Sequence, residues 1–129
     1  IVESHGRQKK FYADDFILAT GGVYGGGLIA GIGSLKEPIF NIDIEVPEVQ
    51  TDWSDKKLFS KSKQLFAQFG IEVNNNLVPI TKDGKQIIDN LKIVGRNLAG
   101  YDFCYEKSGN GVALITAYKA AMDLCKVVR

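Results

Sequence analysis

The residues in this chain that are best suited to bind a ligand are small ones, at Gly109, Asn110 and Gly111. They follow a glycine-containing loop and open an alanine-rich segment, so the sequence predicts that they form the first turn of a helix. The first amides of a helix have no carbonyl partner within it, and the helix dipole adds about half a positive charge there. We therefore expect this turn to bind an electron-rich or anionic group through its backbone.

Two other glycine turns have the form of a strand that ends at a ligand loop. One turn follows the apolar residues 16–19 and the other follows residues 92–94. In parallel sheets ligands bind beyond the carboxyl ends of the strands, so both turns can meet at one site. Each turn taken singly is also explained by ordinary turn chemistry, but the pair favours a shared ligand. The residues of these turns that we assign to the ligand are Thr20, Gly21, Gly22 and Gly95.

Apolar patterns predict the strands that position these turns. Residues 16–19 and 92–94 are continuously apolar or nearly so, as in strands buried on both faces of a parallel sheet. Residues 39–46 alternate strictly between apolar and polar, which predicts a half-buried antiparallel strand. Residues 1–13 alternate on either side of a turn at residues 6–8, which predicts a hairpin.

Two segments have helical spacing. Residues 55–69 carry recurring apolar side chains and stop at Gly70, and a second helix is predicted over residues 109–127. The sequence therefore predicts an α/β fold with a mixed sheet, a single domain over residues 1–129, and an antiparallel cap segment at about 34–80. The second helix is expected to pack on the sheet through a face of small side chains, namely Ala113, Ala117, Ala120, Ala121 and Leu124.

Composition excludes several classes of protein. The chain has 129 residues, of which 45% are hydrophobic and 24% charged, and its formal net charge is +1, which provides no field for nucleic acid. Cys104 and Cys125 lie far apart with only His5 to help, so we expect reduced thiols and no metal site. No apolar run approaches the roughly 20 residues that span a bilayer. Because the chain begins at Ile1 in what reads as mid-strand, we expect a fragment.

The glycine turns carry a family resemblance. Residues 13–22, ADDFILATGG, resemble the "ATG" segment of two-dinucleotide-binding-domain flavoproteins, and residues 90–95 with 109–113 resemble their carboxy-terminal flavin signature. In order and spacing the chain is similar to the family of B subunits of anaerobic glycerol-3-phosphate dehydrogenases, related to the flavoproteins of succinate dehydrogenase and fumarate reductase. The segments that carry this closer resemblance are residues 36–40, Trp53, residues 66–70, residues 77–79 and residues 100–102.

The resemblance implies an enzyme subunit that oxidises sn-glycerol 3-phosphate to dihydroxyacetone phosphate through a flavin and passes electrons to quinone. It implies FMN, with FAD as the alternative, and two partners: the catalytic, FAD-bearing A subunit of the complex, and an iron–sulfur subunit that anchors it at the membrane. The location implied is cytoplasmic and peripheral to the membrane. No G-x-G-x-x-G follows a strand here, so we expect the chain to be the C-terminal part of a Rossmann-like flavoprotein that lacks the main phosphate-binding unit.

In this resemblance the substrate hydride goes to flavin N5, and the amides of residues 109–111 face N1 and O2, where negative charge appears. Thr20 to Gly22, with Gly95 and Arg96, line the ribityl or phosphate side; a solvated surface role is the alternative for Arg96. Asp102 accepts from the ribityl hydroxyls or, alternatively, caps its own loop. Lys107 is either a substrate-phosphate contact or an exposed lysine. No residue is assigned as the general base.

Three other functions fit the same residues. A fumarate reductase-like dehydrogenase is one, although its dicarboxylate substrate calls for convergent arginine and histidine side chains that the sequence does not assemble. A non-catalytic assembly module that kept the fold without its cofactor is the second. The third is a glycine-loop phosphate binder, which predicts nucleotide binding without a flavin spectrum.

Overall fold

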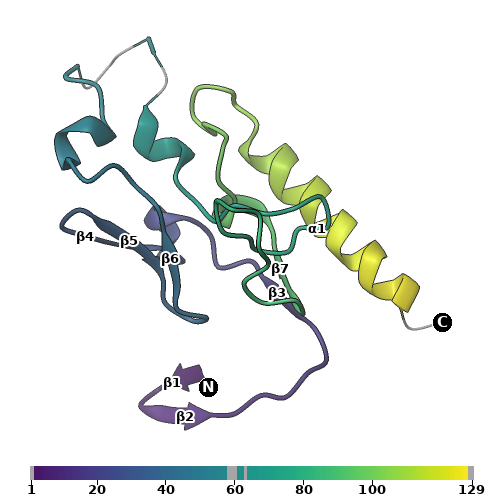
Figure 1. Cartoon of the computed structure of the whole chain (residues 1–129). Coiled ribbons are helices and arrows are strands. Elements are labelled where there is room, and N and C mark those ends of the chain that lie inside the picture. Colours follow the sequence, from purple (N-terminus) through teal and green to yellow (C-terminus); the bar gives the residue numbers. More distant parts are fainter. Residues whose placement is uncertain (1, 58–60, 63, 128–129) are drawn as a thin grey trace.

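The computed structural model describes residues 2–57, 61–62 and 64–127. Short strands and 3-10 turns precede one long helix (Figure 1). In chain order the elements are β1 (Val2–Ser4), β2 (Arg7–Lys9), β3 (Phe16–Leu18), η1 (Val23–Gly25), β4 (Ile29–Gly31), β5 (Ser34–Glu37), β6 (Ile42–Ile44), η2 (Gln50–Trp53), η3 (Leu65–Gln68), β7 (Leu91–Ile93), η4 (Gly95–Asn97) and α1 (Gly109–Val127).

The strands β3 and β7 form a parallel pair, with Phe16 opposite Leu91 and Leu18 opposite Ile93. This confirms the two predicted strands to within a residue at each end. The expectation that both faces are buried was wrong for β3, since Ile17 keeps 44% of its surface exposed. Ile17 lies on the opposite face of β3 from the buried Leu18, and the described elements leave that face partly open.

A separate antiparallel sheet has the order β4, β5, β6. The alternating pattern of the predicted third strand is confirmed, because Ile42 and Ile44 are buried while Asp43 between them is exposed. The strand is shorter than residues 39–46 because a turn precedes it. In that turn the buried carboxylate of Glu37 accepts hydrogen bonds from the amides of residues 39 and 40, at 2.8 and 2.7 Å.

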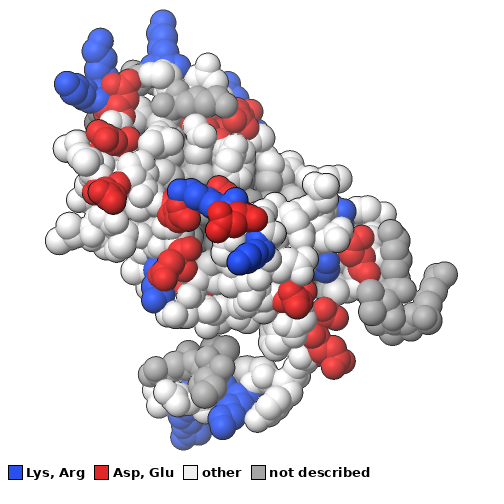
Figure 2. Space-filling model, viewed as in Figure 1, with Lys and Arg blue, Asp and Glu red and all other residues white. Residues whose placement is uncertain are grey.

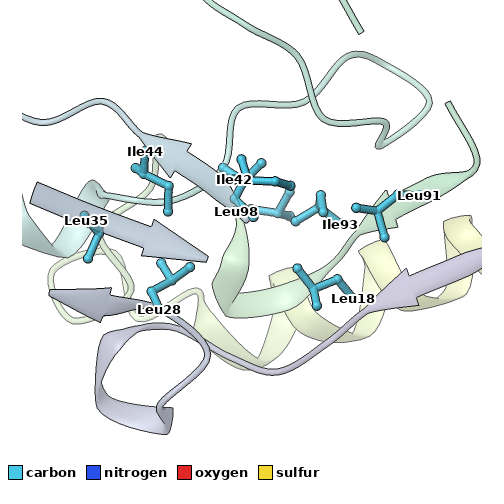
Figure 3. Close-up of a cluster of buried hydrophobic side chains, with 9 residues drawn as sticks. Leu18, Leu28, Leu35, Ile42, Ile44, Leu91, Ile93 and Leu98 are labelled. Atoms are coloured by element: carbon cyan, nitrogen blue, oxygen red, sulfur yellow. The ribbon is translucent and has the colours of Figure 1, made fainter. Parts of the chain in front are cut away.

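The single mixed sheet of the prediction was wrong. Among the described residues, no backbone hydrogen-bond ladder connects the parallel pair to the antiparallel sheet, and side-chain packing joins them instead. Figure 3 shows their aliphatic side chains meeting between the two sheets. The members of this core are Leu18, Leu28, Leu35, Ile42, Ile44, Ile71, Leu91, Ile93 and Leu98.

The helix α1 packs against η4, the turn that follows β7, and against Leu77 and Val94 (Figure 1). Its predicted range, residues 109–127, is confirmed. Ala120 is fully buried against Leu77 and Val94, but Ala117 and Ala121 are exposed. The buried face of α1 is therefore rotated about the helix axis relative to the predicted face. The buried side is set by the contact of α1 with η4, which gives a stripe through residues 113, 116, 120 and 124. None of the described helices is long and apolar enough to cross a bilayer.

The predicted helix over residues 55–69 was wrong. Only η3 is helical there, and residues 55–57, 61–62 and 64 are not; Leu58 and Phe59 lie outside the described residues. Gln64 has an extended backbone, its amide donates to Asp102 at 3.2 Å, and its side chain accepts from the Asp55 amide at 2.8 Å. These two hydrogen bonds, one to a residue far along the chain and one across a loop, take the place of the i to i−4 hydrogen bonds of a helix. Tertiary structure therefore overrides the helical spacing of the sequence.

The predicted amino-terminal hairpin is confirmed as β1 paired with β2. Its turn lies at His5 and Gly6, both with positive φ, so Arg7 already belongs to the second strand. In Figure 1 the hairpin stands away from the body at the end of an extended segment. Figure 2 shows basic and acidic side chains interspersed on the face in view, in keeping with the net charge of +1.

Candidate functional site

The two glycine turns lie against each other at the carboxyl ends of β3 and β7. A Cβ built on Gly22 would lie 3.2 Å from the carbonyl oxygen of Arg96, so the backbones of the two turns are in close contact. The structure therefore brings together the two turns that the sequence separates by more than 70 residues. A side chain larger than hydrogen at Gly22 would push them apart.

Asn97 joins the two turns and is fully buried. Its Oδ1 accepts from the amide of Gly21 at 2.9 Å, and its Nδ2 donates to Oγ1 of Thr20 at 3.1 Å. Sequence reasoning missed this residue. The sequence feature that could have identified it is an amide side chain, which carries both a donor and an acceptor, in the turn that directly follows a buried strand. Because Asn97 uses the Gly21 amide and the Thr20 hydroxyl, these two groups hold the turn in place.

Glycine is required at two further points by the shape of the turns. A Cβ on Gly27 would overlap the carbonyl of Gly21 and lie 2.7 Å from the carbonyl carbon of Thr20. Gly95 has a φ of +65°, and its amide donates to Oγ1 of Thr116 in α1 at 3.0 Å. The second turn is therefore fixed to the helix as well as to the first turn.

The first turn of α1 faces the same region. The amide of Val112 donates to the carbonyl of Ser108 at 2.9 Å, which is the first hydrogen bond of the helix. The amides of residues 109–111 precede it, as the sequence predicted. A Cβ built on Gly111 meets no heavy atom within 4 Å, so the turn is open at this residue, whereas a Cβ on Gly109 would lie 3.4 Å from Cβ of Phe103.

Arg96 lies beside this turn, and it is not a freely solvated arginine. Its Cζ is 2.9 Å from the centroid of the Phe103 ring, a cation–π contact, and its Nη1 is 3.9 Å from a Cβ built on Gly109. Burial raises the pKa of Tyr101, and the positive charge of Arg96 partly opposes that rise. The Tyr101 hydroxyl donates to the carbonyl of Gly95 at 3.2 Å.

A cavity of about 470 Å³ opens between the glycine turns and the cap segment. Trp53 lines this cavity and is also packed: its Nε1 donates to the carbonyl of Pro47, and its ring packs edge-on against Phe69. Sequence reasoning missed most of this wall, because its residues come from four separate segments. The aromatic lining consists of Tyr24, Trp53, Phe66, Phe69, Tyr101 and Phe103.

Comparison with known proteins identifies the family. Residues 1–112 match the model of the family described as "FAD binding domain". This chain belongs to that family. Its residues suit the family's flavin in two respects: the donors near the first turn of α1 are backbone amides and one arginine, and the position of a Cβ on Gly111 is open. The aromatic side chains that line the cavity are also of a kind that stacks on a planar ring.

Relatives of this chain carry a more specific name. A protein of Halobacterium salinarum (strain ATCC 29341 / DSM 671 / R1), named as a probable B subunit of anaerobic glycerol-3-phosphate dehydrogenase, is 37% identical over 127 residues, covering 98% of this chain and 29% of the relative. The B subunit of anaerobic glycerol-3-phosphate dehydrogenase from Aliivibrio fischeri (strain MJ11) is 40% identical over 87% of this chain and 24% of its own length. The chain thus spans a quarter to three tenths of these relatives. No solved structure matches it significantly.

Asp102 has the loop-capping role that the sequence offered as an alternative. Only 2% of its surface is exposed. Oδ1 accepts from the amides of Cys104 and Tyr105 at 3.0 and 2.9 Å, and Oδ2 accepts from the amide of Gln64. Contact of Asp102 with ribityl hydroxyls stays a prediction, and its two oxygens already have backbone donors.

The other residues considered in the sequence lie at the surface of the described structure. Lys107 and His5 are exposed, and both cysteines are free and exposed. No group of three metal-ligating side chains occurs among the described residues. The described lining of the aromatic cavity contains no carboxylate or imidazole, so the general base stays unassigned.

The first turn of α1 allows a test of the predicted flavin site. Gly111→Ala is expected to leave the fold intact, and to stabilise the helix by up to about 1 kcal/mol, because the methyl group meets no neighbour. Flavin affinity should fall about tenfold, since the methyl group lies where a ligand approaches the amides. The measurement is a flavin titration of the full-length gene product, alongside its thermal unfolding.

The matched control for this test is Ala117→Gly, at an exposed position farther along the same helix. It should lower stability by about 1 kcal/mol and leave flavin affinity unchanged. Equal flavin affinity in wild type and Gly111→Ala would exclude the first turn of α1 from the flavin site.

Proposed function

We propose that this chain contributes part of the flavin site in a dehydrogenase subunit that oxidises sn-glycerol 3-phosphate to dihydroxyacetone phosphate and passes the electrons to quinone. The observation that carries the proposal is the meeting of two glycine turns, joined through Asn97, beside the open first turn of α1. The names of the relatives, as B subunits of anaerobic glycerol-3-phosphate dehydrogenase, support this substrate. The cap segment, about 34–80, closes the site on its aromatic side.

The chain's own residues would hold and orient the cofactor, whose chemistry is acceptance of a hydride from the secondary carbon of the substrate. The amides of residues 109–111 would donate to the electron-rich edge at N1 and O2. Thr20 to Gly22 and Gly95 would let the backbone approach the ribityl side, with Asn97 fixing their relative position. The aromatic cavity would exclude water from the ring.

We propose FMN as the cofactor, with FAD as the alternative. The relatives are named as subunits, which supports assembly with other chains. The partners we propose are the catalytic, FAD-bearing A subunit of the complex, and an iron–sulfur subunit that holds the complex at the cytoplasmic side of the membrane. A fumarate reductase-like activity is the alternative within the same class of enzyme.

A non-catalytic assembly module is the second candidate function. The observation in its favour is the aromatic cavity, whose described lining offers no carboxylate or imidazole to deprotonate a substrate hydroxyl. The cofactor separates the two candidates, because an assembly module needs no reducible flavin.

The test is a visible absorption spectrum of the full-length gene product, purified alone and together with its catalytic partner. We expect flavin bands that glycerol 3-phosphate bleaches in the complex and fumarate does not restore, and FMN in the material released on denaturation. A spectrum without flavin bands, in a protein that also fails to take up FMN or FAD, would contradict the proposed dehydrogenase function and favour the assembly module.

A further inference from the structure

Arg96 is the only charged side chain among the described residues that line the aromatic cavity. Its guanidinium is stacked on Phe103, and the described residues supply no carboxylate partner for it. A cation in an uncharged, aromatic and partly enclosed space is poorly screened by water. The cavity is therefore electrostatically suited to a ligand that carries negative charge.

The position of the guanidinium adds to this potential. It lies against Gly109, the first residue of α1, where the helix dipole is positive. Tyr101 lines the same cavity, and the positive charge of Arg96 acts to lower the pKa of its hydroxyl. Arg96 and Tyr101 thus line the cavity, Gly109 lies beside the guanidinium, and the described lining contains no negatively charged side chain.

The walls of the cavity discriminate between two kinds of anion. A phosphate is compact and strongly hydrated, and it is best bound by several donors in a polar site. A planar ring with delocalised charge instead stacks on aromatic side chains, and one of its edges contacts the cation. Trp53, Phe66 and Phe103 therefore favour a ring over a phosphate as the partner of Arg96.

We propose that Arg96 stabilises the negative charge that appears on the flavin ring upon reduction, and that it does not bind a flavin phosphate. This inference rests on the proposed function. Addition of one hydride to the neutral oxidised ring, at N5, delivers two electrons and one proton and leaves one net negative charge on the ring. The hydride comes from the secondary alcohol of the substrate, and dithionite supplies the electrons in a titration. Arg96 would then bind the reduced ring more tightly than the oxidised one.

The experiment compares wild type with Arg96→Gln, Arg96→Met and Arg96→Lys in the full-length gene product loaded with FMN. Dissociation constants for oxidised FMN and riboflavin are measured first, and midpoint potentials are then obtained by reductive titration against a reference dye. The two neutral variants should bind oxidised FMN within about threefold of wild type. They should bind the reduced form about tenfold more weakly, which for a two-electron couple is a midpoint potential about 30 mV lower. Arg96→Lys should recover at least half of this shift.

Lys92→Gln is the matched control. Lys92 is a half-buried cation on β7, and its Nζ donates to the carbonyl of Asn76, away from the cavity. Its removal costs the same unit of charge and should leave the midpoint potential unchanged.

Three outcomes would overturn the proposal. If the wild-type protein binds no flavin, both the proposed role of Arg96 and the proposed function are wrong. A normal FMN content with an unchanged potential in both neutral variants removes the role of Arg96 alone. Weaker binding of oxidised FMN, with riboflavin binding unchanged, assigns Arg96 to the phosphate. The use of two neutral side chains keeps the comparison available if one of them fails to fold.

Discussion

Asn97→Ala is expected to separate the two glycine turns and to abolish flavin binding by the full-length gene product. The substitution removes two hydrogen bonds from a fully buried side chain and leaves the Gly21 amide without its acceptor. The Thr20 hydroxyl is exposed and can bind water, so we expect a loss of about 2–3 kcal/mol, mainly from the amide. Hydrogen exchange of peptides covering residues 16–28 and 91–98 measures this local opening.

Asn90→Ala is the matched control for that experiment. Asn90 lies at the opposite end of the same strand pair, where its exposed Nδ2 donates to the carbonyl of Asp14 at 2.8 Å. It joins the same two chain segments, but it is solvated and remote from the turns, so its loss should cost about 0.5–1 kcal/mol and leave flavin content unchanged. Similar exchange and flavin content in the two variants would mean that Asn97 does not organise the site.

Gly27→Ala is expected to have a comparably large effect through a different mechanism. The added methyl group would collide with the backbone of Thr20 and Gly21, and backbone atoms cannot rotate out of the way as a side chain can. The turn must therefore open, at a cost of about 3 kcal/mol or more. The loss is measured as a lower unfolding temperature together with faster exchange over residues 16–28.

Gly26→Ala separates crowding from backbone strain. Gly26 has a φ of +77°, but a Cβ there meets no atom within 4 Å. It should cost only about 1–2 kcal/mol, the penalty for a left-handed residue that bears a Cβ. If Gly27→Ala is no more destabilising than Gly26→Ala, the close approach of the two backbone segments is not a constraint on the fold.

The sequence predicted those features that depend on local pattern. The range of α1, the two strands of the parallel pair, and the burial of alternate residues in β6 were all confirmed, because each follows from spacing within one short segment. The helix over residues 55–69 failed for the converse reason. There the amide of Gln64 has its partner in Asp102, 38 positions along the chain, and no local pattern encodes that bond.

The site divides in the same way. The glycine turns and the first turn of α1 were recognisable from residue types at strand and helix ends, and the structure brings them together, while their contacts with flavin stay predictions. Asn97 and the aromatic wall were not recognised. Asn97 acts on residues 76 and 77 positions away, and the wall exists only after segments around Tyr24, Trp53, Phe66 and Phe103 have packed together.

The distance along the chain between the two turns also governs when the site can form during synthesis. The first turn leaves the ribosome 76 residues before Asn97, the residue that fixes it. At the usual rate of roughly 5–20 residues per second, this leaves about 4–15 seconds in which the strand β3 has no partner. Closing so long a loop before its contacts form makes the pairing slow, and the nascent β3 edge stays open to other strands in the meantime. We therefore expect the glycine turns to be the last part of this chain to mature.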